Sequence, residues 1–123
     1  MKIKKGSKEI EIKVKKCNWF RKAFGLMFCR REKAKALLFE FSKPVQFHLT
    51  SMFVFFPFVC AWLDERNNII DIRKIEPFKF HVPSRKFYKK FVEIPISSHY
   101  KEIIQNLVGE EKFKKKCYLN SIY

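Results

Sequence analysis

Hydrophobic and polar positions alternate most strictly near the start of the chain. Within residues 8–15, charged residues alternate with three apolar ones, Ile10, Ile12 and Val14. A period of two is typical of a strand with one buried face. Gly6 and Ser7 supply a turn just before it. The pattern therefore predicts an opening hairpin whose first strand lies around residues 2–4.

Residues 52–63 form an uninterrupted apolar and aromatic run. The run has 12 residues, whereas a membrane-spanning helix needs about 20, and Pro57 would interrupt a helix. Phe and Val favour strands, and continuous apolarity suits a strand buried on both faces. We therefore expect central strands of a β core and no membrane span, with Pro57 at a strand end or edge.

Other segments rich in apolar and β-branched residues predict further strands at 36–41, 45–49, 69–75 and 87–94. Residues 59–63 and 69–75 pair as a hairpin across 64–68, because Asn in the turn tolerates a left-handed backbone. The same turn chemistry accounts for Asp64 and Asp71 at the ends of the connection, without a catalytic role.

Two helices are expected. A C-terminal amphipathic helix, capped by Ser97 or Ser98, is indicated by apolar residues at helical spacing, namely Tyr100, Ile103, Ile104, Leu107 and Val108. A short N-terminal helix begins after Asn18 and is closed by Gly25. The predicted fold is mainly β (α+β by content), a compact barrel or sandwich-like antiparallel sheet with these two helices. Residues 1–123 form a single domain, with 113–123 as a basic tail or edge strand.

Lysine dominates the charge of the chain, which has a net charge of +15 and a pI near 9.9. Such a field attracts polyanions, but lysine-rich surfaces are also common in thermophile proteins. Tyr88 or Phe87 could stack nucleobases beside the basic residues. The candidate polyanion contacts form three clusters with two further lysines, Lys35 and Lys112, beside them: Arg30, Arg31 and Lys33; Arg85, Lys86, Lys89 and Lys90; and Lys114, Lys115 and Lys116.

Residue patterns that support catalysis or cofactor binding are missing from the sequence. Three glycines cannot build a phosphate-binding loop or a nucleophile elbow. The three histidines stand apart, and the four cysteines lack the close pairs of a zinc site. We therefore expect no cofactor, no metal and no catalytic residue. The N-terminus leads into charged alternation rather than an apolar segment, which favours a cytoplasmic protein.

Five short segments follow one another along the chain at residues 24–28, 37–41, 55–64, 68–72 and 90–95, and Gly109-Glu110 follows the predicted helix. Their order resembles the pattern "GLMFR", "lLF.F", "FPiDviFLD", a strand and "viElP" of the family called domain of unknown function 192 (uncharacterised protein family 0127), of the archaeal type. The resemblance covers about residues 17–112 and implies a compact, mainly β domain with no assigned activity. Val59 stands where the family usually has a carboxylate, and Cys29 follows "GLMF" here.

Three functions remain open from the sequence. The first is a small β-domain that acts as a binding or interaction module without catalysis. The alternative is a weakly sequence-specific nucleic-acid binder that uses the basic clusters. The third is a ligand-binding or enzymatic site in the mouth of a β-barrel.

Overall fold

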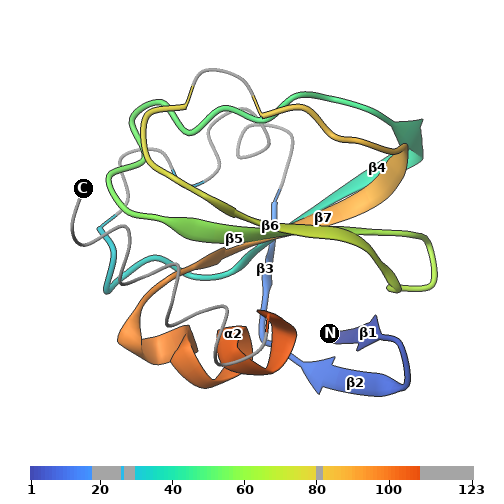
Figure 1. Cartoon of the computed structure of the whole chain (residues 1–123), viewed down its shortest axis with the longest axis horizontal. Coiled ribbons are helices and arrows are strands. Elements are labelled where there is room, and N and C mark those ends of the chain that lie inside the picture. Colours follow the sequence, from blue (N-terminus) through green and yellow to red (C-terminus); the bar gives the residue numbers. More distant parts are fainter. Residues whose placement is uncertain (18–25, 27–29, 80–81, 109–123) are drawn as a thin grey trace.

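Residues 1–17, 26, 30–79 and 82–108 are described in the computed structural model of the chain (Figure 1). The predicted short N-terminal helix and the tail at 113–123 lie outside these residues. The elements, in chain order, are β1 (Lys2–Lys5), β2 (Lys8–Glu11), β3 (Lys15–Lys16), β4 (Leu37–Val45), β5 (Phe58–Leu63), β6 (Ile69–Ile75), β7 (Tyr88–Pro95), a 3₁₀ turn (Ser98–Tyr100) and α2 (Lys101–Val108).

A five-stranded sheet with the order β3-β4-β7-β5-β6 forms the centre of the molecule. Its strands are antiparallel except for the short β3, which runs parallel to β4. A separate two-stranded sheet consists of β1 and β2. The mainly β prediction is confirmed. The barrel is wrong, because in the described part of the chain β3 and β6 remain the two edges of an open sheet.

Local patterns predicted both hairpins, although the strand expected over residues 8–15 ends at Glu11 and is followed by the separate β3. Gly6 adopts φ 61° in the turn between β1 and β2, a conformation that glycine reaches without steric cost. In the β5–β6 turn, Asn67 adopts φ 66°. Asp64 accepts hydrogen bonds there from the backbone N–H groups of Arg66 and Asn68, both at 2.9 Å. Asp64 is therefore a turn residue, as the sequence predicted.

Only the second half of the apolar run at 52–63 forms a strand. All six residues of β5 are buried, and β5 lies between β6 and β7. Residues 52–57 instead form a loop in which Phe53 and Phe55 are exposed. The prediction of central strands holds from Phe58 onward and is wrong before Pro57, which marks the strand start as expected.

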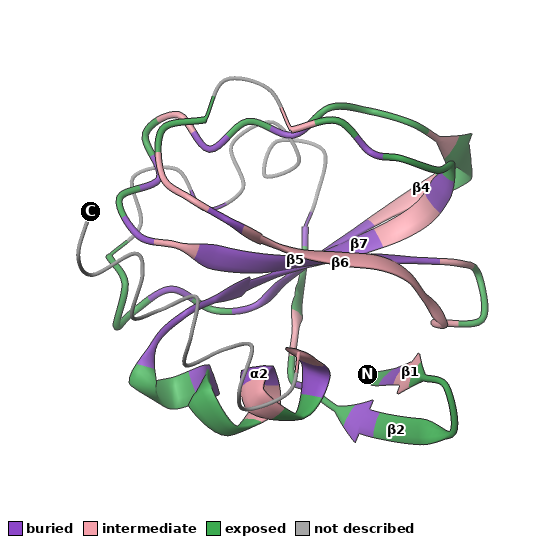
Figure 2. Ribbon diagram, in the orientation of Figure 1, coloured by how far each residue is buried: buried purple, intermediate pink, exposed green. Residues whose placement is uncertain are grey.

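One face of the large sheet is covered by α2 and the β1–β2 hairpin (Figure 2). Val59, Ala61 and Leu63 of β5 point to this face and pack in one apolar cluster with Ile104 and Leu107 of α2. The helix prediction is confirmed, but Ser97 forms no side-chain cap hydrogen bond. Among the described residues, no helix is long and apolar enough to cross a membrane.

Candidate functional site

The opposite face of the sheet is covered by two loop segments, which we call the aromatic arch. The first is residues 46–56, and the second consists of the described residues 77–79 and 82–87. The segments run side by side from one end of the sheet to the other (Figure 1). Leu49 and Val82 exchange two backbone hydrogen bonds of 2.8 Å at the middle of the arch. Near one end, the Gln46 side chain donates to the carbonyl oxygen of Ser84 at 2.9 Å.

Exposed phenylalanines gather on this arch. The exposed large hydrophobic side chains of the described chain are Phe47, Phe53, Phe55, Phe78 and Phe87, each between 49% and 64% exposed. All five belong to the arch, and none lies on the α2 side. Single exposed apolar residues are normal on a protein surface, but a group of them confined to one feature marks an interaction site.

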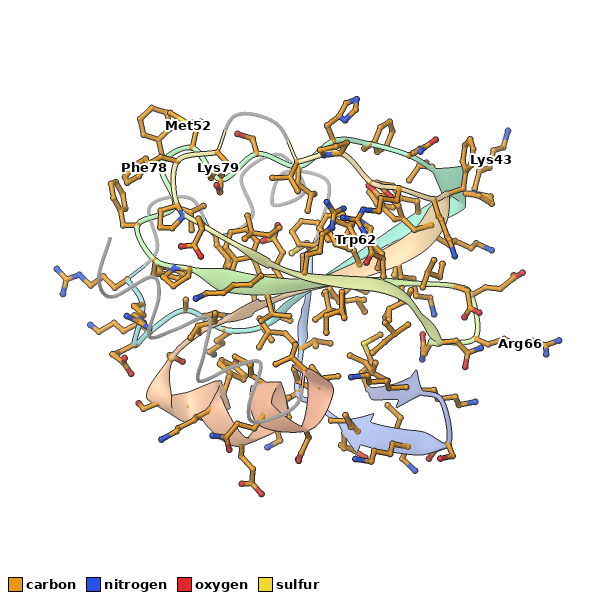
Figure 3. The ribbon with its side chains drawn as sticks, in the orientation of Figure 1. Lys43, Met52, Trp62, Arg66, Phe78 and Lys79 are labelled. Carbon is orange, nitrogen blue, oxygen red and sulfur yellow. The ribbon has the colours of Figure 1, made fainter. Side chains whose placement is uncertain are left out.

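Positive charge accompanies these rings without negative charge between them. The sequence has no Asp or Glu in residues 42–63 or 77–92, which include the whole arch. Four exposed basic residues lie on the arch or beside its β4 end, namely Lys43, Lys79, Arg85 and Lys86. Lys79 and Lys43 mark its two ends in Figure 3. Exposed basic side chains on segments that contain no acidic residue attract polyanions.

The structure does not merge the first two predicted basic clusters. Arg30, Arg31 and Lys33 are exposed before β4, close to the Pro95 end of β7, where the Arg31 Nε donates to the Ile96 carbonyl at 2.5 Å. The second cluster begins at the other end of β7. The eight residues of β7 separate Arg85 and Lys86 from the first cluster, a distance of about 25 Å at the usual rise per residue. The third cluster, Lys114, Lys115 and Lys116, lies outside the described residues.

The second cluster is itself divided. The Lys89 Nζ pairs with the Glu65 carboxylate at 3.4 Å, and the Lys90 Nζ donates to the Asn67 side-chain oxygen at 2.9 Å. Both lysines therefore contact the β5–β6 turn. Arg85 and Lys86 remain on the arch with exposed side chains.

Phe87 and Tyr88 have opposite environments. Phe87 is 64% exposed, whereas Tyr88 is only 1% exposed and its hydroxyl donates to the Phe47 carbonyl oxygen at 3.2 Å. Burial raises the pKa of Tyr88 to about 12, so the phenol stays protonated and keeps this bond. The prediction that Tyr88 could stack a base is wrong. Phe87 retains a free ring surface for that role.

A shallow pocket of about 120 Å³ lies beside Phe87. Its lining includes Pro44, Ile70 and the acidic residues Asp64 and Glu65. The volume is below the several hundred Å³ usual for small-molecule sites. The pocket thus gives little support to the sequence-based alternative of a ligand site in a barrel mouth.

A row of ionisable side chains lies beneath the arch. Glu93 of β7 pairs in register with Cys60 of β5, which pairs in turn with Arg73 of β6. Burial raises the pKa of Glu93 to about 8, although a hydrogen bond from the Leu26 backbone N–H opposes this. Burial also raises the pKa of the Cys60 thiol. Both groups are therefore uncharged at neutral pH, and the thiol is not an activated nucleophile.

Arg73 connects this row to the arch. Its guanidinium lies 4.4 Å from the centre of the Trp62 ring, pairs with Asp71 at 3.3 Å and donates to the Pro83 carbonyl oxygen at 2.5 Å. Since Pro83 belongs to the arch, the cation serves to hold the arch on the sheet. Val59, which occupies the carboxylate position of the family pattern, faces the other side and packs in the α2 core.

Sequence reasoning missed two groups of residues in this site. Lys43 and Lys79 were not among the predicted contacts, because the fold alone brings them onto one surface with Arg85. Phe53 and Phe55 were assigned to the core because of their apolar neighbours. The acid-free stretches at 42–63 and 77–92 were the signal in the sequence that could have identified this surface.

Together, the open sheet, the helix on one face and the arch on the other define a mainly β domain with a basic, aromatic surface. The chain belongs to the DUF192 family, described as "Uncharacterized ACR", whose model matches residues 1–105. The match begins before the expected Cys17 and includes the β1–β2 hairpin.

Two solved structures share the fold. A "putative transcription regulator" from Sinorhizobium meliloti has a TM-score of 0.68 and 18% identity over 83% of this chain and 82% of that one. A protein of unknown function from Novosphingobium aromaticivorans has a TM-score of 0.65 and 13% identity over 82% of this chain and 74% of that one. No curated protein matches significantly. At these identities the two structures show the fold alone.

Proposed function

We propose that this chain is a binding module whose aromatic arch binds single-stranded nucleic acid with little sequence specificity. One observation supports this most directly: five exposed phenylalanines and three exposed basic residues belong to an arch that contains no acidic residue of its own, and the exposed Lys43 lies beside its β4 end. Aromatic rings stack on unpaired bases, and basic side chains neutralise the phosphates between them. Neither contact requires a particular base.

The arrangement suits a single strand better than a duplex. In a duplex the faces of the bases are stacked on one another, so rings such as Phe78 and Phe87 have no base surface to contact. Sequence-specific reading of a duplex commonly places a helix in the major groove. Ile104 and Leu107 of α2 are instead packed against the sheet, on the side away from the arch. Stacking and phosphate contacts therefore account for the surface better than groove recognition.

Titration of the protein into a fluorescent oligothymidylate of about 20 nucleotides, followed by anisotropy, tests the proposal. We expect binding at about 50 mM salt that weakens as salt increases. The slope of log K against log salt should be close to −3, since four phosphate contacts contribute about −0.7 each on a single strand. A duplex of the same length should bind more weakly.

Anionic phospholipid vesicles serve as the competing ligand, because exposed Phe and Lys residues also suit a lipid surface. No binding to the oligonucleotide at low salt would overturn the proposal. Retention on the vesicles without binding to the oligonucleotide would overturn it in favour of a membrane surface.

A further inference from the structure

Phe55 and Phe78 form an exposed aromatic pair at one end of the arch. Their ring centroids are 5.6 Å apart with planes at 74°, an edge-to-face arrangement. The rings are 59% and 52% exposed, so each keeps much of its surface open to solvent. Figure 3 shows Phe78 close to Met52 and Lys79 at this end. An apolar pair with a neighbouring cation matches the alternation of base and phosphate along a nucleic-acid strand.

The backbone around this pair is held in an unusual conformation. Phe53 has φ 63° and Phe78 has φ 61°, the left-handed region that bulky side chains rarely adopt. Folding alone does not account for phenylalanine at these two left-handed positions, because both rings are about half exposed and contribute little to the core. Backbone strain of this kind concentrates where a protein displays residues for binding.

Ser51 fixes the two strained loops to each other. It is fully buried, and its hydroxyl donates to the Glu76 carbonyl oxygen while accepting from the Lys79 N–H at 2.8 Å. Its backbone carbonyl accepts from the Phe78 N–H at 2.9 Å. Three polar groups of the segment 76–79 thus meet at one serine of the other loop. This network determines the direction in which the Phe78 ring leaves the surface.

We propose that the Phe55–Phe78 pair is a base-stacking subsite, with Ser51 as its positioning residue. One unpaired base lies on the exposed face of this pair, and the Lys79 ammonium contacts the phosphate next to it. The subsite rests on the proposed function and adds a location to it. Rings fixed in advance lose less conformational entropy when a strand binds, which explains why the strained backbone is retained.

Phe78→Asn is the decisive variant, because Asn tolerates the left-handed backbone and lacks the ring. We expect the melting temperature to stay unchanged or rise by a few degrees, since strain is relieved. Affinity for oligothymidylate should fall about 10-fold, the loss typical of one stacked base. The salt slope should not change, because no phosphate contact is removed. Phe78→Trp, which keeps an aromatic ring, is the matched control and should retain affinity.

An oligothymidylate that carries one 2-aminopurine reports on stacking itself. Its fluorescence should be quenched by the wild-type protein and by Phe78→Trp, unquenched by Phe78→Asn, and partly quenched by Ser51→Ala at an unchanged salt slope. Wild-type affinity and quenching in Phe78→Asn would overturn the subsite while leaving the proposed function intact. No binding by the wild-type protein would overturn the proposed function itself. Loss of quenching in Phe78→Asn but not in Ser51→Ala would overturn the positioning role of Ser51.

Discussion

The folding stability of the wild-type protein is expected to decrease as the pH rises from 4.5 to 8, and replacing Glu93 by glutamine is expected to remove this decrease. Burial raises the folded-state pKa of Glu93 from 4.5 to about 8. Below pH 4.5 both states carry the protonated carboxyl and the group contributes nothing to the pH dependence. As pH rises, the unfolded chain releases its proton first, so folding becomes less favourable until the folded state also ionises near pH 8.

The expected loss is about 5 kcal/mol across this interval, since each unit of pKa difference corresponds to about 1.4 kcal/mol. Above pH 8 the difference between the two proteins levels off. The new amide introduces a cost of its own, because in the described part of the chain the Glu93 Oε2 has no hydrogen-bond partner. That cost is independent of pH, so the two proteins still differ in the slope of their free energy of unfolding against pH.

Urea unfolding of both proteins at intervals from pH 4.5 to pH 9 measures this effect. Glu9→Gln is the matched control, because Glu9 is an exposed glutamate of β2, and its profile should follow that of the wild-type protein. Parallel profiles for wild-type and Glu93→Gln would show that Glu93 is already ionised in the folded protein, contrary to its buried position beneath the arch.

The second large effect is expected when four positive charges are removed from the arch rather than from the opposite face of the protein. One variant carries K43Q, K79Q, R85Q and K86Q, all on or beside the arch. The control carries K2Q, K8Q, K13Q and K101Q, exposed lysines of the face covered by the β1–β2 hairpin and α2. Both variants lower the net charge from +15 to +11. Any difference between them therefore reports the location of charge rather than its amount.

The arch variant should bind oligothymidylate about 100-fold more weakly at low salt. Its slope of log K against log salt should change from about −3 to a value close to zero. The control should lose less than about threefold, because exposed charges farther than a Debye length from the strand are screened. Anisotropy titrations at several salt concentrations measure both quantities. Equal losses in the two variants would mean that the +15 charge attracts nucleic acid without a dedicated surface.

Local interactions explain which parts of the fold could be predicted from the sequence. The β1–β2 turn depends on Gly6, the β5–β6 turn on Asp64 and Asn67, and α2 on apolar residues at helical spacing, all within a few positions of one another. Whether the sheet is open or closed into a barrel could not be predicted in this way. It depends on whether β3 pairs with β6, and these strands are more than fifty residues apart in sequence.

The loop at 52–57 shows the limit of hydrophobic patterns. Apolar residues indicate burial only on average, and the run of Phe and Val looks the same whether a ring enters the core or leaves it. Phe56 is 2% exposed and its neighbour Phe55 is 59% exposed. The loop that carries both rings is held by the Ser51 hydrogen bonds and contains the left-handed backbone of Phe53. Neither has a signature in the sequence.

The surface proposed to bind nucleic acid was predicted only in part for a similar reason. Arg85, Lys86 and Phe87 are adjacent in sequence and remain together on the arch. Lys89 and Lys90 look equivalent to them in sequence but contact Glu65 and Asn67. The side to which each strand residue points, and which distant segment lies there, follow from the pairing of β7 with β5.

Photocrosslinking tests the central claim, that single-stranded nucleic acid lies on the aromatic arch. An oligonucleotide with 5-iodouracil in place of thymine is irradiated on the wild-type protein, and the crosslinked residues are located by mass spectrometry. Stacked aromatic side chains should be the main sites, within the peptides that contain Phe47, Phe53, Phe55, Phe78 and Phe87. Crosslinks concentrated in the β1–β2 hairpin or α2, or spread evenly over both faces, would contradict the account.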